Sequence, residues 1–265
     1  MRGIIVVTVM LAMLGVTEGS NKKGIGIAGA DTYICGDEQA FTTAHWWYDW
    51  RIKPTEHQLK NCTNKPKPGY VPLVWGHGQW AATKFNLTDD IHYVLGFNEP
   101  NHPEQVNMTP YTAAKHWQAI ETRAPGKVLV SPAAAPCGHC KYDTIAWLDE
   151  FFRNCTGCRV DHIATHAYWC NADKIMSFLK QIWDRFHKPI WLTEFACMKT
   201  HSVNVQLQFM RDLLPRLEAA PFVFRYAWFV SRWSGDGFVT SSASLLHQHS
   251  PTLTTLGHFY NNFIH

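Results

Sequence analysis

Two glutamates stand at the ends of apolar runs, where a carboxylate needs either a partner or a task. Glu99 follows Asn98 near the end of VLGFNEP, and Glu194 lies near the end of PIWLTEF. Because proline cannot donate to a strand ladder, Pro100 places Glu99 where a buried strand gives way to a loop. Two carboxylates in one cleft are the groups that cleave glycosidic bonds, one as proton donor and one as nucleophile or base. The alternative is that both acids form salt bridges.

The elements that would position these glutamates recur along the chain as apolar, β-branched or aromatic runs, usually followed by helical spacing. The eight runs cover residues 24–28, 43–48, 70–75, 93–97, 127–132, 162–168, 189–195 and 222–230. Helical spacing covers residues 110–124, 145–153, 173–186 and 203–219. The segment after the first run shows the weakest helical pattern. Several runs lack alternation, which indicates parallel strands covered on both faces.

Eight such units predict an α/β fold, a (β/α)8 TIM barrel in a single domain. The competing architecture is an open doubly wound sheet, but the first run is not followed by a glycine-rich fingerprint. In a barrel, catalytic groups lie at the C-terminal ends of the strands. Glu99 lies just past the end of the fourth run, and Glu194 lies near the end of the seventh. We therefore expect both carboxylates at one mouth.

The N-terminal segment predicts a secreted protein. Residues 1–19 combine Arg2 with a short apolar run, which is typical of a signal peptide, and leave 20–265 as the catalytic domain. The run is too short to span a bilayer comfortably, so we expect an extracellular protein that does not engage the membrane. Four glycosylation sequons, at Asn61, Asn86, Asn107 and Asn154, suit that route.

Composition favours a sugar chain over nucleic acid as partner. The net charge is only +3, and the chain has no long basic run, so the field that nucleic-acid binding needs is missing. The chain has 12 tryptophans. Flat apolar rings suit the apolar faces of sugars.

The eight cysteines predict disulfides in an oxidising compartment. We expect Cys35 to pair with Cys62, and Cys170 with Cys197. The remaining cysteines form two C-x-x-C pairs, Cys137 with Cys140 and Cys155 with Cys158, whose spacing would also suit a structural zinc site.

Seven motifs together resemble glycoside hydrolase family 128, the secreted β-1,3-glucanases related to alkali-sensitive linkage proteins of cell walls. They are VPLVWG (71–76), LGFNEPN (95–101), VSPAA (130–134), WLDEFF (147–152), VDHIATHAYW (160–169), KPIWLTEFAC (188–197) and LTTLGHFYN (253–261). The resemblance spans residues 23–262 and implies a compact barrel that hydrolyses β-1,3-glucan with retention.

The resemblance also implies roles for individual residues. The acid/base of the family falls on Glu99 and its nucleophile on Glu194, with no metal or other cofactor. Asn98 matches the asparagine before the acid, where an amide can bind the sugar 2-hydroxyl. The His-x-Tyr pattern of the family falls on His166 and Tyr168, which would orient Glu194 or contact substrate. The alternative is that either ring is a packing residue.

Other positions extend or depart from this pattern. Trp46, Trp75, Trp169 and Trp228 lie near strand ends and are candidate stacking platforms for substrate, with core packing as the alternative. Asp49 stands where the family often has asparagine. If Asp49 lines the groove, a charge replaces an amide there.

We expect a monomeric enzyme whose partner is β-1,3-glucan. Three other functions fit parts of the pattern. The barrel could bind glucan without cleaving it, although the presence of both glutamates argues against this. It could cleave another β-linked glycan, such as β-1,4-mannan or cellulose, because the carboxylate pair does not select the substrate. The cysteines could instead hold zinc in a protein of another function.

Overall fold

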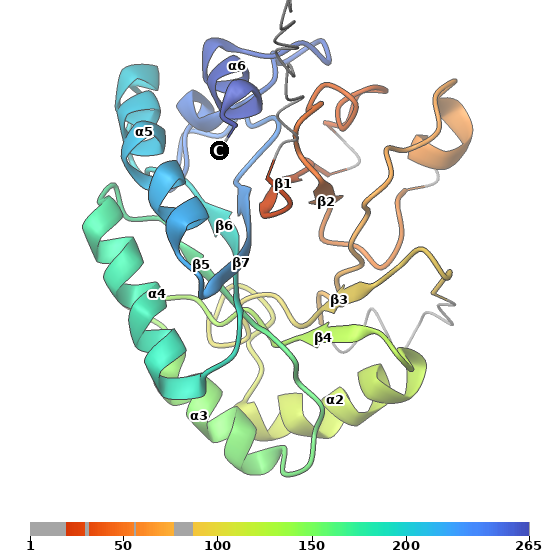
Figure 1. Cartoon of the computed structure of the whole chain (residues 1–265), viewed down its shortest axis with the longest axis vertical. Helices are drawn as coiled ribbons and strands as arrows, with labels where there is room; N and C mark the ends of the chain where they lie inside the picture. The colour runs from red at the N-terminus through yellow and green to blue at the C-terminus, as the bar shows by residue number, and fades with distance from the viewer. Residues whose placement is uncertain (1–19, 30–31, 56, 77–86, 265) are drawn as a thin grey trace, which may run out of the picture.

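The computed structural model describes residues 20–29, 32–55, 57–76 and 87–264, and shows parallel strands in a ring with helices outside it (Figure 1). The strands are β1 (Lys23–Gly26), β2 (Trp46–Tyr48), β3 (Tyr93–Leu95), β4 (Val128–Val130), β5 (Ile163–Ala167), β6 (Ile190–Phe195) and β7 (Val223–Trp228). The helices are α2 (Pro110–Arg123), α3 (Thr144–Asn154), α4 (Ala172–Phe186), α5 (Val203–Ala219) and α6 (Thr255–Asn262), with short turns η1 (His57–Asn61) and η2 (Ser241–Ala243). The predicted signal peptide and Asn86 lie outside the described residues.

The strands pair in the order β2-β1-β7-β6-β5, and β3 pairs with β4, always in parallel. Single parallel bridges close the ring, from Val130 to His162 and, through the run 70–75, from Trp47 to Tyr70 and from Leu73 to Leu95. That run forms bridges instead of a continuous ladder, and Pro72 within it has no N–H to donate. The predicted (β/α)8 barrel is confirmed. The run 70–75 lies between β2 and β3 and completes the eight strand positions of the ring.

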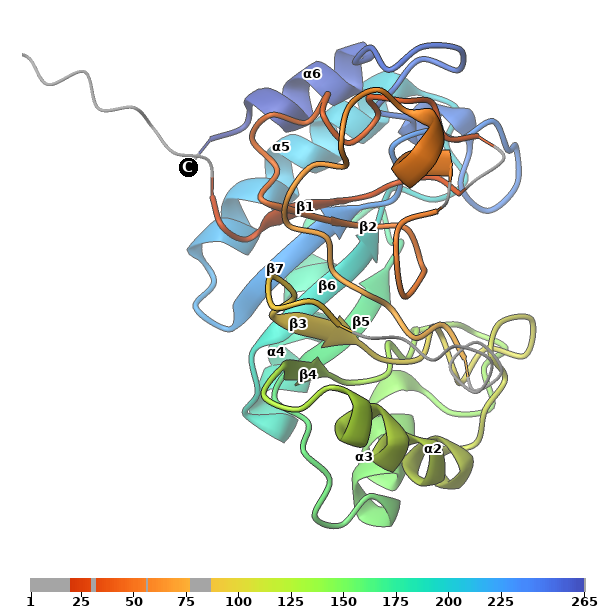
Figure 2. The same ribbon diagram turned by 90° about the vertical axis from the view of Figure 1, so that its right-hand side faces the viewer.

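Side-chain caps explain where four of the helices begin. Thr109, Asp143, Asn171 and Ser202 each accept a hydrogen bond from a backbone N–H in the first turn of α2, α3, α4 and α5. Each of these helices begins and ends within one residue of its predicted bounds. Figure 2 shows α2 and α3 beside β3 and β4, and α5 and α6 on the opposite side of the barrel near β1.

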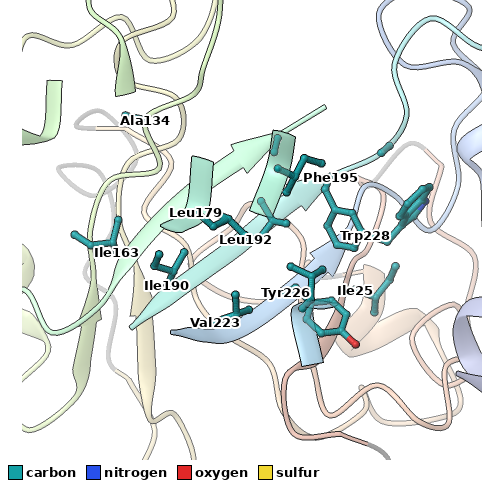
Figure 3. Close-up of a cluster of buried hydrophobic side chains, with 14 of the residues drawn as sticks. Ile25, Ala134, Ile163, Leu179, Ile190, Leu192, Phe195, Val223, Tyr226 and Trp228 are labelled. Carbon is teal, nitrogen blue, oxygen red and sulfur yellow. The ribbon is translucent and has the colours of Figure 1, made fainter. Parts of the chain in front are cut away.

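Apolar side chains fill both faces of the ring. The larger cluster lies between the strands and the helices, and Figure 3 shows it around Leu192, Phe195 and Tyr226. The smaller cluster fills the barrel interior with aromatic and aliphatic side chains. Inside the barrel the Arg225 guanidinium lies 4.3 Å from the ring centre of Tyr93. The interior is therefore a packed core and not a pore, as in other TIM barrels.

Lys23 ties the start of the barrel to the last helix. Its buried ammonium group donates to the carbonyl of Tyr260 at 3.0 Å and to that of Asn261 at 3.2 Å. These are carbonyl groups at the C-terminal end of α6, which have no partner within the helix.

Among the helices that the structure describes, none combines the length and the apolar character that a membrane span requires.

All eight cysteines form disulfides. The predicted pairs Cys35–Cys62 and Cys170–Cys197 are confirmed. Each C-x-x-C pair also closes on itself, as Cys137–Cys140 and Cys155–Cys158. The four-cysteine zinc alternative is wrong for this arrangement, because the disulfides use the thiolates that zinc would need.

Candidate active site

A cavity of about 710 Å³ opens at the C-terminal ends of the strands. This volume is typical of ligand pockets. Its lining includes Trp50, Trp75, Asn98, Glu99, His102, Gln105, Tyr168, Trp169, Glu194, Phe229, Trp233 and Phe238. The two glutamates therefore share one cleft, as the barrel topology predicts.

Glu99 lies just beyond β3 in a strained backbone conformation, with φ at +39°. A non-glycine residue rarely adopts this left-handed region, and the cost persists only where the surroundings fix the backbone. Here the Asn98 N–H donates to the Trp75 carbonyl at 2.9 Å, and the Glu99 N–H donates to the Ala133 carbonyl at 3.0 Å. Hydrogen bonds to the segments on both sides, at Trp75 and Ala133, therefore fix the backbone that presents the Glu99 carboxylate to the cavity.

Glu194 belongs to β6 and is only 5% exposed. Both of its carboxyl oxygens accept hydrogen bonds. Trp50 donates from Nε1 to Oε1 at 2.7 Å, and the Tyr168 hydroxyl donates to Oε2. Hydrogen bonds of this kind favour the ionised carboxylate and fix its orientation.

His166 lies between the two glutamates and is 1% exposed. Its Nδ1 is 2.7 Å from Glu99 Oε1 and 3.4 Å from Glu194 Oε2. One nitrogen of the ring and one oxygen from each carboxyl group all lie within 4.8 Å of one another. A register shift between Thr165 and His166 sets His166 opposite Glu194 on the neighbouring strand. The three groups form one triad, Glu99–His166–Glu194.

The charges in the triad depend on one another. Burial raises the pKa of Glu194, and repulsion from Glu99 adds to this effect, against the attraction of His166. Burial also acts to raise the pKa of Glu99, but the hydrogen bond and charge of His166 outweigh it, so this pKa lies below its ordinary value. Burial acts to lower the pKa of His166, but attraction to both carboxylates raises it overall.

These directions favour a proton on His166 and an ionised Glu99 beside it in the free triad. An acid catalyst must instead begin protonated, which requires a proton to reach Glu99 before the leaving group departs. The pKa of Glu99 lies below its ordinary value because His166 Nδ1 is only 2.7 Å from Glu99 Oε1.

Asn98 offers an unpaired acceptor to the cleft. It is 5% exposed, and its Nδ2 donates to Gln105 Oε1 at 3.4 Å. Its Oδ1 is buried and has no hydrogen-bond partner. A buried polar atom left unpaired costs free energy, so a ligand hydroxyl that donated to Oδ1 would be stabilised there.

Of the four tryptophans predicted as stacking platforms, Trp75 and Trp169 line the cavity. The prediction is wrong for Trp46 and Trp228, which are buried elsewhere. Trp46 begins β2 and points into the barrel interior, where its ring centre lies 5.0 Å from that of Trp191. Trp228 ends β7 but faces the helices, beside Phe195 (Figure 3). Strand alternation sends side chains to opposite faces, so position near a strand end does not suffice.

The aromatic residues that sequence reasoning missed lie in loops after strands. Trp50 follows β2 with φ at +58° and reaches Glu194, while Phe229, Trp233 and Phe238 line the cavity after β7. The signal for Trp50 is its place two residues beyond a predicted strand. Asp49, in contrast, is buried, does not line the cavity, and accepts a hydrogen bond from the Tyr70 hydroxyl at 2.7 Å.

A parallel barrel with two buried carboxylates in its C-terminal cleft is the architecture of glycosidases. The chain belongs to the family described as glycosyl hydrolase catalytic core, which matches residues 24–260. The resemblance to glycoside hydrolase family 128 is confirmed by solved structures.

Among these structures is a subgroup II endo-β-1,3-glucanase of family 128 from Sorangium cellulosum, with 32% identity, a TM-score of 0.75, and coverage of 91% of this chain and 98% of that one. Another is a subgroup I endo-β-1,3-glucanase from Amycolatopsis mediterranei in complex with laminarihexaose, with 26% identity, a TM-score of 0.72, and coverage of 91% and 99%. Alkali-sensitive linkage protein 1 of Schizosaccharomyces pombe is 30% identical over 177 residues, which are 63% of this chain and 32% of that protein. The chain thus spans about a third of that relative.

Proposed function

We propose that this protein is a secreted, retaining glycoside hydrolase that cleaves β-1,3-glucan, with Glu194 as nucleophile and Glu99 as acid/base. The observation that carries the proposal is the Glu99–His166–Glu194 triad, whose facing carboxyl oxygens lie within 4.8 Å of each other in the cleft. Retaining glycosidases hold their carboxyl groups about 5–5.5 Å apart, closer than the spacing that leaves room for a water in inverting enzymes. The glucanases of family 128 support the choice of substrate.

In the first step, a Glu194 oxygen attacks the anomeric carbon while Glu99 protonates the leaving glycosidic oxygen. The bond between carbon and leaving oxygen breaks, and a glycosyl ester of Glu194 forms. In this mechanism Glu99 is ionised in the free triad and receives its proton from His166 Nδ1 across the 2.7 Å hydrogen bond. As Glu194 loses its negative charge to the bond with the anomeric carbon, its attraction for a proton on His166 falls, which favours transfer of that proton to Glu99.

In the second step, ionised Glu99 takes a proton from water, and the resulting hydroxide displaces Glu194 from the anomeric carbon. Two inversions give net retention. Esterification of Glu194 removes a negative charge near Glu99 and lowers its pKa, which suits its change from acid to base. No step requires a metal or an organic cofactor.

Substrate contacts in the proposal use groups that the cavity leaves available. Asn98 Oδ1 accepts from the 2-hydroxyl of the sugar, a contact that strengthens as the oxocarbenium ion forms. Trp75 and Trp169 stack on sugar faces in the same cleft. The predicted signal peptide and the four disulfides support secretion, because such bonds persist in oxidising compartments.

The test is reducing-sugar release from linear β-1,3-glucan, with β-1,4-glucan and β-1,4-mannan in parallel. We expect cleavage of the first alone, and a loss of about 10²-fold or more in Glu99→Gln and Glu194→Gln. Glu150→Gln, on the outer helix α3, is the matched control and should retain activity. Proton NMR of the first product should show the β-anomer. Release of the α-anomer, or an active Glu194→Gln, would refute the mechanism.

A further inference from the structure

A second cluster of metal-binding side chains lies at the rim of the cleft, away from the triad. A ring nitrogen of His102, a ring nitrogen of His139 and the sulfur of Cys137 all lie within 4.8 Å of one another. The two imidazole rings meet edge to face, with centres 4.7 Å apart. All three residues line the same cavity as Glu99. We call this set the rim cluster.

The donor set of the rim cluster is one that zinc prefers. Two imidazoles and a thiolate form tetrahedral zinc sites, with a water or another thiolate as the fourth ligand. His102 Nδ1 accepts a hydrogen bond from the Glu104 backbone N–H at 3.1 Å, which leaves Nε2 free to bind metal. His139 is exposed, so its ring can reorient around an ion.

The Cys137–Cys140 disulfide masks the sulfur ligand. A disulfide sulfur carries no charge, and the thiolate is the form that binds metal. This bond closes a loop with a sequence separation of only 3, so it restricts the unfolded chain little and contributes little to stability. Both cysteines are partly exposed, and Gly138 and His139 between them are exposed. A soluble dithiol can therefore reach this bond.

The Cys155–Cys158 disulfide provides a comparison within the same chain. It has the same sequence separation of 3, but Cys155 is only 5% exposed. Among the described residues, the groups of three or more side chains that could hold a metal do not include Cys155 or Cys158. With equal spacing, one pair therefore lies beside two histidines that could bind a metal, and the other forms a partly buried crosslink.

We propose that reduction of Cys137–Cys140 by a dithiol converts the rim cluster into a zinc site that partly closes the cleft. The dithiol gives two electrons and two protons to the sulfurs and becomes a disulfide itself, leaving two cysteine thiols. Zinc then binds His102, His139 and the Cys137 sulfur, whose proton it displaces to solvent. Cys140 or a water fills the fourth position. The obstruction of glucan binding rests on the proposed function, whereas the zinc site does not.

The test uses a variant that frees Cys137 without a reductant, so the other disulfides stay intact. Cys140→Ser leaves the Cys137 thiol beside both histidines, and Cys158→Ser is the matched control that frees Cys155. Zinc is added to each purified protein, and bound metal is counted after equilibrium dialysis by atomic emission. We expect one zinc per chain in Cys140→Ser and none in Cys158→Ser. Further replacement of His102 or His139 by Ala in Cys140→Ser should abolish stoichiometric binding.

Two results would overturn the zinc site: no zinc in Cys140→Ser, or binding that survives loss of both histidines. Melting temperatures with and without zinc provide a second readout, since a bound ion should raise that of Cys140→Ser alone. Hydrolysis of β-1,3-glucan by Cys140→Ser, measured with and without zinc, tests the obstruction separately. Zinc binding in a protein that never cleaves glucan would refute the proposed function and leave the site standing.

Discussion

His166 contacts both proposed catalytic carboxyl groups, and this position gives it more influence than either packing or substrate contact would. Its Nδ1 is shared between Glu99 at 2.7 Å and Glu194 at 3.4 Å. A protonated His166 in this position stabilises both carboxylates, because each then faces an opposite charge. At the scale of single residues, the protonation states in the cleft therefore depend on His166 as much as on the two glutamates.

Replacement of His166 by Gln should lower kcat for glucan hydrolysis by about 10²-fold and move the alkaline limb of the kcat/KM profile to lower pH. In the wild type that limb reports loss of the proton from His166, whose pKa is raised by Glu194 and Glu99. In the variant the last proton leaves a carboxyl group instead, which releases it at lower pH. An unchanged profile in a folded His166→Gln protein would contradict the shared proton.

At the scale of elements, the sequence predicts where the strands end, but it does not predict which face of the barrel each side chain near a strand end points to. The runs of buried, β-branched residues and the caps at Thr109 and Asp143 mark helices and strands in the sequence itself. Placement of Glu99 and Glu194 follows from barrel topology. Trp46 and Trp228 were misplaced because the choice between the barrel interior, the helix side and the cleft depends on strand tilt and register. The place of Trp50 two residues beyond a predicted strand is visible in the sequence, but its contact with Glu194 also depends on a positive φ that no sequence pattern signals.

The join between β2 and the run 70–75 contains a carboxyl group that should make stability depend on pH. Burial raises the pKa of Asp49 from 3.8 to about 6, against the lowering effect of the Tyr70 hydroxyl. Its Oδ2 is buried without a partner. Because the folded-state pKa lies above the unfolded value, the folded protein holds this proton more tightly. The associated stability is present at low pH and is lost as pH rises through about 6.

We therefore expect Asp49→Asn to gain about 2–3 kcal/mol relative to wild type between about pH 4 and pH 7, which is the linkage from a shift of about two pKa units. Urea unfolding of both proteins at several pH values, with disulfides intact, measures this difference. Groups that titrate in both proteins cancel. A difference that stays constant across the range would contradict a protonated Asp49.

At the scale of the whole molecule, one buried ion pair connects the loop after β1 to the segment after β7. Arg232 and Asp37 form a bidentate pair, with Nη1 at 2.5 Å from Oδ2 and Nη2 at 2.7 Å from Oδ1, and both residues are almost fully buried. Arg232 also donates to the carbonyl groups of Thr32, His247 and Ser250. The pair holds together two loops that a sequence pattern cannot connect, because its members lie 195 positions apart.

Replacement of Arg232 by Met should destabilise the fold by about 3–5 kcal/mol, because Asp37 would remain buried without a cation. The matched control is Arg216→Met, whose partner Asp173 is largely exposed on the surface, and which should cost less than about 1 kcal/mol. Chemical denaturation of both variants measures the contrast. Equal losses would show that burial of the Arg232 pair is not the source of its contribution.

The pairing of β1 between β2 and β7 sets a condition on biosynthesis. The strand made first cannot complete its hydrogen bonds until Val223–Trp228 has left the ribosome, and the Lys23 ammonium reaches its carbonyl acceptors only after Tyr260 and Asn261 have followed. Local disulfides such as Cys155–Cys158 need no such delay. A nascent chain stalled before β7 would carry an open ring with β1 and β6 as free edges, which are the surfaces that associate wrongly with other chains. Chaperones that shield strand edges during translation should therefore affect the yield of folded protein more than chaperones that act after release from the ribosome.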